Sequence, residues 1–353
     1  MGCWPAARRA DRTEENVIST ITDVARAAGV SVATVSRALR GLDRVSPETR
    51  QRVLEVAEEL HYVASPTATS LASGRTRVVA VVAPFLTRWF FATLVSAIEK
   101  ELRSHGHHAI LFDLEDDSYD QRLPLTQNML WKRVDGVITL NVPMEQEEVD
   151  LVDRLGLPLV AIGSAVPGRA CVRIDDGATM RTAVEHLISL GHRRIGYIGD
   201  VPRNVAHVQT PQDRLTAFRA TMAEAGLEVV EDWILGSDWT AEAAARDSAI
   251  LLSHAERPTA VVAASDEMAI GVRESARKGG LRVPEDLSVI GIDDYVLSGV
   301  LGLTTVRQDV AAQGREAAVL LLRALTGEEP ALEQVVMPTE LVVRESTGPV
   351  PVS

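Results

Sequence analysis

The chain has 353 residues, 46% of them hydrophobic, which is enough for a small domain and a large one with a sizeable core. Its two cysteines, Cys3 and Cys171, exclude a disulfide framework and a cysteine-based metal site, and nothing in the sequence indicates a cofactor. Residues 1–77 hold 11 Lys and Arg against 9 Asp and Glu (+2), whereas residues 78–353 hold 25 against 40 (−15). Any contact with nucleic acid should therefore fall to the N-terminal part.

The first 16 residues are polar and charged and have no apolar run. They predict a disordered tail (residues 1–16) and not a signal peptide. Nowhere is an apolar stretch long enough to cross a bilayer, so we expect a cytoplasmic protein without a membrane partner.

Two short helices joined by a tight turn are predicted within residues 17–63. Thr20 can cap the first helix, and Gly29 stands where a helix must stop and the chain must reverse. Ser31 can cap a second helix over 32–39. The apolar positions that would pack the pair are Ile21, Val24, Ala25, Ala28, Val35 and Leu39. This pattern is typical of a helix-turn-helix.

The outward face of the second helix suits the reading of bases. Arg37 can bond two acceptors of guanine, and Val32 or Ala33 can touch a thymine methyl group. Thr34 and Ser36 are short hydroxyls suited to phosphate oxygens. The alternative is an ordinary helical hairpin in which Arg37 is a solvated surface charge; the position and spacing favour DNA.

A third helix and a short linker complete the N-terminal part. The run at 46–48, Ser-Pro-Glu, is a strong helix start, and Val53, Val56, Ala57 and Leu60 follow at helical spacing. Residues 64–76 then form a hinge in which Ser65 and Pro66 can begin a helix that Gly74 ends. A helix this short is marginal alone, so it should order only on a partner; a flexible linker is the alternative.

Residues 20–74 resemble the headpiece of the LacI/GalR family of bacterial transcription regulators. The matching stretches are 23–37, 45–50 and 60–62. The resemblance implies that the hinge enters the minor groove, where Leu71 wedges between base pairs. Ordinary packing is the alternative for Leu71. The family usually has proline in place of Ala64 and arginine in place of Thr69, which removes a contact to the DNA backbone.

The resemblance predicts double-stranded operator DNA and a second copy of the chain as partners. A two-fold dimer would read two half-sites, and because the C-terminus has no leucine heptad we expect a homodimer. The predicted DNA-contacting residues are Thr22, Ser31, Val32, Ala33, Thr34, Ser36, Arg37 and Arg40 in the helix-turn-helix, and Ser65, Thr67, Ala68 and Leu71 in the hinge.

From Arg77 onward, apolar strands alternate with helices, which indicates parallel sheets covered on both faces. Strands are expected at 78–84, 109–114, 136–141, 159–163, 194–199, 233–236, 260–265 and 287–292, and helices at 91–105, 123–132, 147–155, 179–190, 212–225, 241–253 and 267–278. The number of strands fits two lobes better than one sheet. The resemblance implies a periplasmic-binding-protein-like type I α/β core over 77–353, with one lobe at 77–175 and 305–333 and the other at 176–304 and 334–347.

Ligands of open α/β sheets bind beyond the C-terminal ends of the strands, so the loops there are the place to search. Asp293 and Ser265 follow strands, Arg214 opens a helix and Trp239 lies in a loop. A carboxylate and a guanidinium can bind hydroxyl groups while an indole stacks on a C–H face, which indicates a sugar or related metabolite as effector. The alternatives are a helix cap for Asp293, an ion pair for Arg214 and a core position for Trp239.

The loop after the first strand departs from the family pattern. Where the family commonly has Asp and Asn, this chain has Phe85, Leu86, Arg88 and Trp89 among the nearby residues. We expect these four to contact the effector. The change favours a more apolar or anionic effector than a simple sugar, with Arg88 as the partner of a negative charge.

The sequence thus predicts a DNA-binding transcriptional regulator, acting as a repressor at the nucleoid, whose operator affinity depends on an effector between the lobes. An enzyme is disfavoured, since residues 195–199 lack dinucleotide spacing and no nucleophile elbow is present. His105, His107 and His108 are interpreted as surface residues and not as metal ligands. The alternative function is a cytoplasmic sugar-binding sensor without operator binding.

Overall fold

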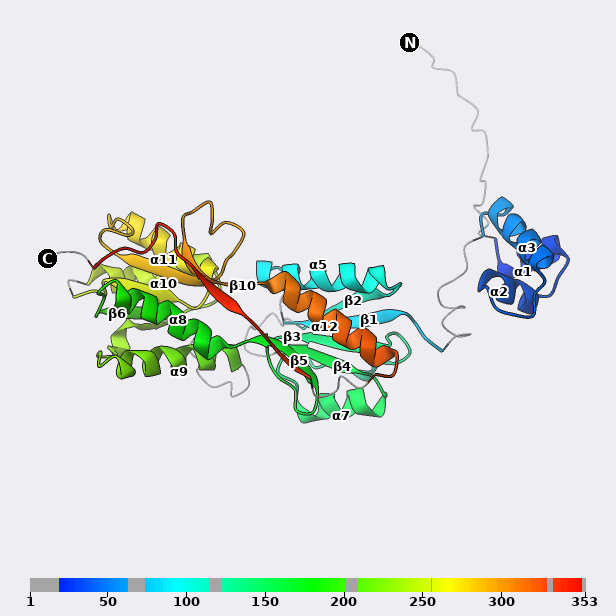
Figure 1. Ribbon diagram of the computed structural model, residues 1–353, viewed down its shortest axis with the longest axis horizontal. Helices are drawn as coiled ribbons and strands as arrows, with labels where there is room; N and C mark the ends of the chain where they lie inside the picture. The colour runs from blue at the N-terminus through cyan, green and yellow to red at the C-terminus, as the bar shows by residue number, and fades with distance from the viewer. Residues whose placement is uncertain are drawn as a thin grey trace, which may run out of the picture. The chain divides into compact units, whose positions relative to one another are not determined.

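The computed structural model describes residues 19–62, 74–84, 86–114, 122–200, 209–254, 256–328 and 333–350. The chain divides into two compact units, Met1–Thr76 and Arg77–Ser353 (Figure 1). Several predictions fall outside the described residues: the disordered tail, the hinge residues Ser65, Thr67, Ala68 and Leu71, and Phe85 of the core.

The described residues of the first unit form three helices, α1 (Ile21–Ala28), α2 (Val32–Leu39) and α3 (Pro47–Glu59). Thr20 and Asp23 form a reciprocal capping box at the start of α1, and Gly29 ends this helix with a left-handed φ of 67°. Ser31 and Ser46 cap α2 and α3. The buried side chains between the helices are Val24, Ala25, Ala28, Val35, Ala38, Val53 and Ala57. The predicted helix-turn-helix is confirmed.

The second unit contains two six-stranded sheets, one in each lobe. The first has the order β11-β5-β4-β3-β1-β2 and the second β12-β10-β9-β8-β6-β7; every pair is parallel except β10 with β12. The strands of the first lobe are β1 (Val78–Ala83), β2 (His108–Asp113), β3 (Gly136–Leu140), β4 (Leu159–Ile162), β5 (Ala170–Ile174) and β11 (Gln334–Met337). Those of the second lobe are β6 (Ile195–Gly199), β7 (Ile234–Gly236), β8 (Ala260–Ala263), β9 (Ser288–Asp293), β10 (Thr304–Gln308) and β12 (Thr339–Val342).

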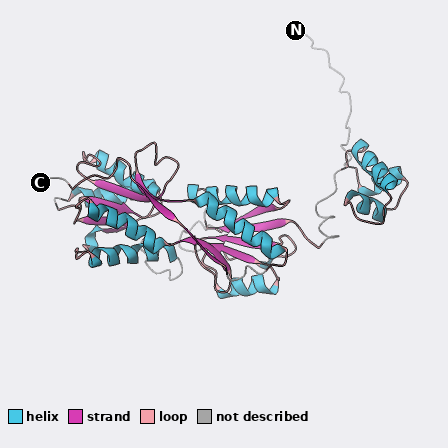
Figure 2. Cartoon of the chain, viewed as in Figure 1, coloured by secondary structure: helices cyan, strands magenta, loops and turns pink. Residues whose placement is uncertain are grey.

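Helices cover both faces of each sheet, as Figure 2 shows for the two lobes. Along β1, Val79 and Val81 face one core cluster while Ala80 and Val82 face another, so the strand is apolar on both sides. The first lobe carries α5 (Trp89–Ser104), α6 (Gln127–Leu130), α7 (Gln146–Arg154) and α12 (Val310–Leu325). The second carries α8 (Asp176–Ser189), α9 (Gln209–Glu224), α10 (Ala241–Ser253) and α11 (Asp266–Lys278), with a short 3-10 helix at Glu231–Trp233.

The strand pairings correct two of the predicted lobe boundaries. Strand β10 pairs with β9, so the chain leaves the second lobe after Gln308 and not at 304. Strand β11 pairs with β5 in the first sheet, so the chain returns to the second lobe only after Met337 and not at 333. The sequence hides β10 because its start, Thr304 and Thr305, is polar although both residues are fully buried.

The helix expected at 123–132 is also shorter than predicted. Helix α6 covers only Gln127–Leu130. Pro124 has no N–H group, and the N–H of Leu125 donates to the Glu148 carboxylate at 2.7 Å instead of entering a helix.

Gly271 on α11 provides a test of how tightly the second lobe is packed. A Cβ added at Gly271 would lie 2.2 Å from the carbonyl oxygen of Ala241 and 2.9 Å from the Ala244 Cβ. We expect Gly271→Ala to lower the free energy of unfolding by about 1–3 kcal/mol, because α10 must move away. Urea denaturation followed by circular dichroism measures this change.

Gly299→Ala is the matched control, since a Cβ there meets no atom within 4 Å. Equal losses of stability for the two variants would contradict close packing of α10 on α11.

Candidate DNA-binding and effector sites

The predicted reading face of α2 lies on the surface of the first unit. Exposed residues of the predicted set are Thr22, Ser31, Val32, Ala33, Arg37 and Arg40, whereas Thr34 and Ser36 are half-buried. The opposite face supplies Val35 and Ala38 to the core. The helix therefore presents a narrow strip of small side chains beside long cations, which suits the major groove.

Some of these side chains already have partners. Ser31 Oγ accepts from the N–H of Thr34 at 3.1 Å and lies 2.9 Å from Thr34 Oγ1. Arg40 Nε donates to the carbonyl of Ser36 at 3.1 Å, across the end of α2. The side chain of Arg37 has no hydrogen bond or ion pair to any residue that the structure describes. Its donors are thus available to an external acceptor.

In the core, Arg214 on α9 lies at the C-terminal ends of the strands of the second sheet. It is 4% exposed, its Nε donates to Asp176 Oδ1 at 2.7 Å, and its Nη1 donates to the carbonyl of Ala264. The structure shows the ion pair with an acid that was the alternative for Arg214, and its role as an effector contact stays a prediction. The half-buried ring of Trp239 lies 6.0 Å from the guanidinium and packs against the core of the lobe.

Asp293 ends β9 in a left-handed conformation, with φ of 124°. Gln308 Nε2 donates to its Oδ1 at 2.6 Å, and Gln313 on α12 of the other lobe donates to Gln308 Oε1 at 2.8 Å. Burial raises the pKa of Asp293 to about 8, although the positive charge of Arg214 opposes the shift. The carboxyl group can therefore hold a proton near neutral pH.

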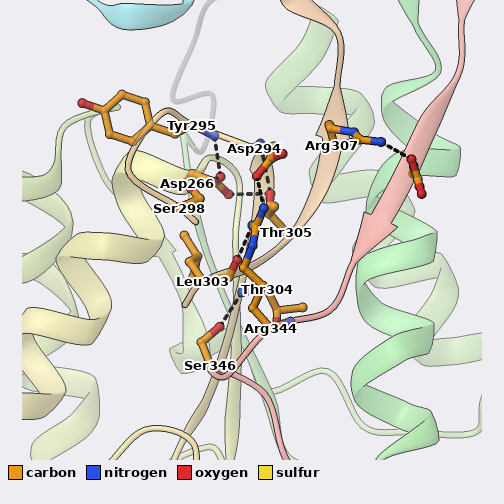
Figure 3. A network of polar contacts seen from close by, with 11 residues as sticks. Asp266, Asp294, Tyr295, Ser298, Leu303, Thr304, Thr305, Arg307, Arg344 and Ser346 are labelled. Carbon is orange, nitrogen blue, oxygen red and sulfur yellow. Dashed lines mark hydrogen bonds and ion pairs between the residues drawn. The ribbon is translucent and has the colours of Figure 1, made fainter. Parts of the chain in front are cut away.

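Ser265 and Asp266 begin α11 but act differently. Ser265 is the N-cap and accepts from the N–H of Met268 at 3.3 Å. Asp266 is fully buried and accepts from the N–H of Tyr295 at 2.9 Å, from Ser298 Oγ at 2.6 Å and from Thr305 Oγ1 at 2.7 Å (Figure 3). Burial raises its pKa to about 6. Asp266 binds residues 29 to 39 positions away in the sequence, which no local pattern indicates.

A second set of contacts in the same network fixes the other end of this loop (Figure 3). Arg344 donates to Asp294 Oδ1 and to the carbonyl of Leu303, both at 2.7 Å. The N–H of Thr304 donates to Ser346 Oγ at 2.8 Å. The loop between β9 and β10 is thus fixed at its start, through Asp294, and at its end, through Leu303 and Thr304.

Two further contacts between described residues join the lobes directly at the cleft. Arg88 Nη2 lies 3.1 Å from Asp238 Oδ1, and the rings of Trp89 and Tyr295 meet edge to face with centroids 5.3 Å apart. Because Asp238 already neutralises Arg88, the structure removes the reason for pairing Arg88 with an anionic effector. Leu86 is half-buried against the core of the first lobe. The effector roles of Leu86, Arg88 and Trp89 stay predictions.

Within the described ranges, no group of three or more His, Cys, Asp or Glu residues could hold a metal ion. No helix found there has both the length and the apolarity needed to cross a membrane.

Comparison with known proteins identifies both parts of the chain. Residues 20–65 match the model of bacterial regulatory proteins of the lacI family, and residues 184–347 match that of a periplasmic binding protein-like domain. Catabolite control protein A of Priestia megaterium is 34% identical over 336 residues, covering 93% of this chain and 99% of the relative. The transcriptional repressor CytR of Escherichia coli (strain K12) is 32% identical, covering 96% and 99%.

Solved structures agree with these sequence matches. The lac repressor dimer bound to operator and the anti-inducer ONPF superimposes with a TM-score of 0.82 at 26% identity, over 94% of this chain and 99% of that one. The complex of the transcriptional regulator CelR with cellobiose has a TM-score of 0.68 at 32% identity, over 93% and 99%. The predicted two-part fold is thereby confirmed, while the individual site residues stay predictions.

Arg37 is the sharpest test of the reading face. Removing its side chain should cost about 1–3 kcal/mol of binding free energy for a specific fragment, because a bidentate contact to guanine would be lost. Gel retardation of a fragment selected by the protein, with Arg37→Ala beside the parent chain, measures the loss. Arg52→Ala removes an equally exposed cation from α3 and should have a smaller effect. Equal effects would argue against base reading by Arg37.

Asp293 predicts a pH dependence of stability. Its pKa is raised from 3.8 to about 8 in the folded protein, so the folded state keeps a proton that the unfolded chain loses. The stability due to the protonated carboxyl is complete below about pH 4 and is lost as the pH rises through about 8. Between about pH 5 and 9, the midpoint of thermal unfolding should change less with pH in Asp293→Asn than in the parent chain.

Asp232→Asn, which changes an exposed carboxylate, is the control and should leave the profile unchanged. In Asp293→Asn, stability should still depend on pH at the acidic end of the range, since the pKa of Asp266 is raised to about 6. An unaltered profile in Asp293→Asn would contradict the burial of a protonated carboxyl at this position.

Proposed function

The chain belongs to the lacI family of bacterial regulatory proteins, and from this membership we propose the roles of its individual residues, its assembly and its effector class. As a member, it is a DNA-binding transcriptional regulator, not an enzyme, and its core responds to a small molecule. A regulator of chromosomal genes acts in the cytoplasm; association with the nucleoid is part of the proposal. Repression is the proposed direction of control, as in the relative CytR, which is named a repressor.

The first unit places α2 in the major groove of an operator. The observation that carries this proposal is the exposed strip of α2 with Arg37 free of partners among the described residues. Arg37 reads guanine, Val32 and Ala33 touch apolar groups of bases, and the capping Ser31 directs the helix toward the duplex. The hinge residues Ser65, Thr67, Ala68 and Leu71 act in the minor groove.

We infer that a homodimer supplies two helix-turn-helix units. The loop after Asp293 exposes apolar side chains on the second lobe: Val296, Leu297, Val300 and Leu301. Val300 is 83% exposed although Asp266 and Arg344 hold the loop in one conformation, and ordered apolar surface of this kind favours burial against a partner. The lac repressor, the structural neighbour, is a dimer on its operator.

The effector is a sugar or related metabolite bound between the lobes. Asp293 and Arg214 supply an acid and a cation for hydroxyl groups, Trp239 supplies an apolar ring, and Ser265 lies at the same edge. From the first lobe the proposed contacts are Leu86, Arg88 and Trp89, together with Phe85, which lies outside the described residues. The neighbour CelR was solved with cellobiose.

The function is tested by retardation of genomic DNA. Fragments captured by the full chain are sequenced, and their retardation is measured with and without candidate sugars. We expect a shared near-palindromic site and an effector-dependent change in affinity of about 5- to 150-fold, the range of ordinary allosteric coupling. The chain lacking residues 1–76 is the control and should retard nothing. Sugar binding without any retarded fragment would instead support the sensor that does not bind an operator.

A further inference from the structure

A cavity of about 440 Å³ opens between the two lobes beside the proposed effector cleft. From the first lobe it is lined by Ser164, which follows β4, and by Arg173 near the end of β5, together with Pro143, Met144 and Ala165. From the second lobe it is lined by Gln209 and Asp213 of α9. Its volume is within the range of small-molecule sites and admits a group the size of a monosaccharide.

The polar groups in this cavity are incompletely bonded. Ser164 is 5% exposed, and its buried hydroxyl oxygen has no hydrogen-bond partner in the described structure. Arg173 is half-buried, and its guanidinium makes no ion pair or hydrogen bond with any described residue. A buried hydroxyl and a half-buried guanidinium without partners are costly unless a ligand or water satisfies them.

Arg173 differs in this respect from the other two arginines at the cleft. Arg88 is paired with Asp238, and Arg214 is paired with Asp176. Their charges are balanced within the protein, so neither demands an anion. Among the described residues at the cleft, Arg173 is thus an arginine whose side chain has no acidic partner.

We propose that this cavity binds an anionic substituent of the effector, a carboxylate or a phosphate monoester, with Arg173 as its main partner. This inference rests on the proposed effector site. A guanidinium binds both anions through paired N–H groups, and these charge-assisted bonds are stronger than neutral ones. The effector would then be an acidic or phosphorylated sugar whose ring reaches Arg214 and Asp293.

Asp213 does not oppose this assignment. It accepts a hydrogen bond from Gln209 Nε2 at 2.7 Å within α9. Asp213 can accept from a hydroxyl of the ligand while the anion binds on the Arg173 side. Arg214, the next residue, connects the cavity to the effector cleft.

Calorimetry on the full chain tests the proposal with matched neutral and anionic sugars. The probes are glucose, glucose 6-phosphate and glucuronate, with ribose and ribose 5-phosphate as a second series and inorganic phosphate alone. We expect at least one anionic sugar to bind about tenfold more tightly than its neutral counterpart. If only the phosphate esters, or only the uronate, bind more tightly than the neutral sugar, the result identifies the anion that the site binds.

Arg173→Gln should abolish the preference, and Arg173→Lys should keep most of it because the charge remains. Arg154→Gln is the matched control, since it removes the same charge from the exposed C-terminal end of α7. Thermal unfolding and DNA retardation of each variant establish that it is folded.

The proposal is overturned if no anionic probe binds more tightly than its neutral counterpart, or if Arg173→Gln retains the preference. These results are separable from failure of the proposed function. A parent chain that retards DNA without preferring anions would refute only the anion site, whereas a chain that retards no genomic fragment would refute operator binding.

Discussion

The chain crosses between the lobes of the core three times, and these crossings place the C-terminal edges of both sheets at one cleft. They follow β5, β10 and β11, so each lies where a strand ends. Parallel strands bring their following loops to the same edge, and the crossings then oppose the two edges. Three short connections permit rotation of one lobe against the other but resist separation, as a hinged cleft requires.

Asp293 connects that cleft to both lobes. Its left-handed φ of 124° is unfavourable for a residue with a Cβ and persists because Asp266 and Arg344 fix the chain on either side of the loop that follows. Gln308 then links Asp293 to Gln313, which lies on α12 of the first lobe. A ligand that changes the charge or position of the Asp293 carboxyl would act on a hydrogen-bonded connection between the lobes.

Helices and strands could be predicted from neighbouring residues, whereas the arrangement of the site depends on contacts between residues that are far apart in the sequence. Thr20, Gly29 and Ser46 fix helix ends through neighbouring backbone groups, so the three helices of the first unit could be predicted. Strand β10 could not, because its buried threonines are satisfied by Asp266 and Ser346, which lie far away in the sequence. Arg88 and Asp238 are 150 residues apart, and no periodicity indicates that they meet.

The arginines show why pairing has to be known before a charge is assigned to a ligand. At the cleft, Arg88 and Arg214 have acidic partners, whereas Arg173 has none among the described residues and lines a cavity. Arg37 is also without a partner there, but it is solvated and would lose water only when α2 enters a groove. An unpaired guanidinium on an open surface costs little, so Arg37 indicates DNA only through its place on α2. Arg173 is more informative, because it is half-buried and lines a cavity between the lobes, where a bound anion can replace the water at its guanidinium.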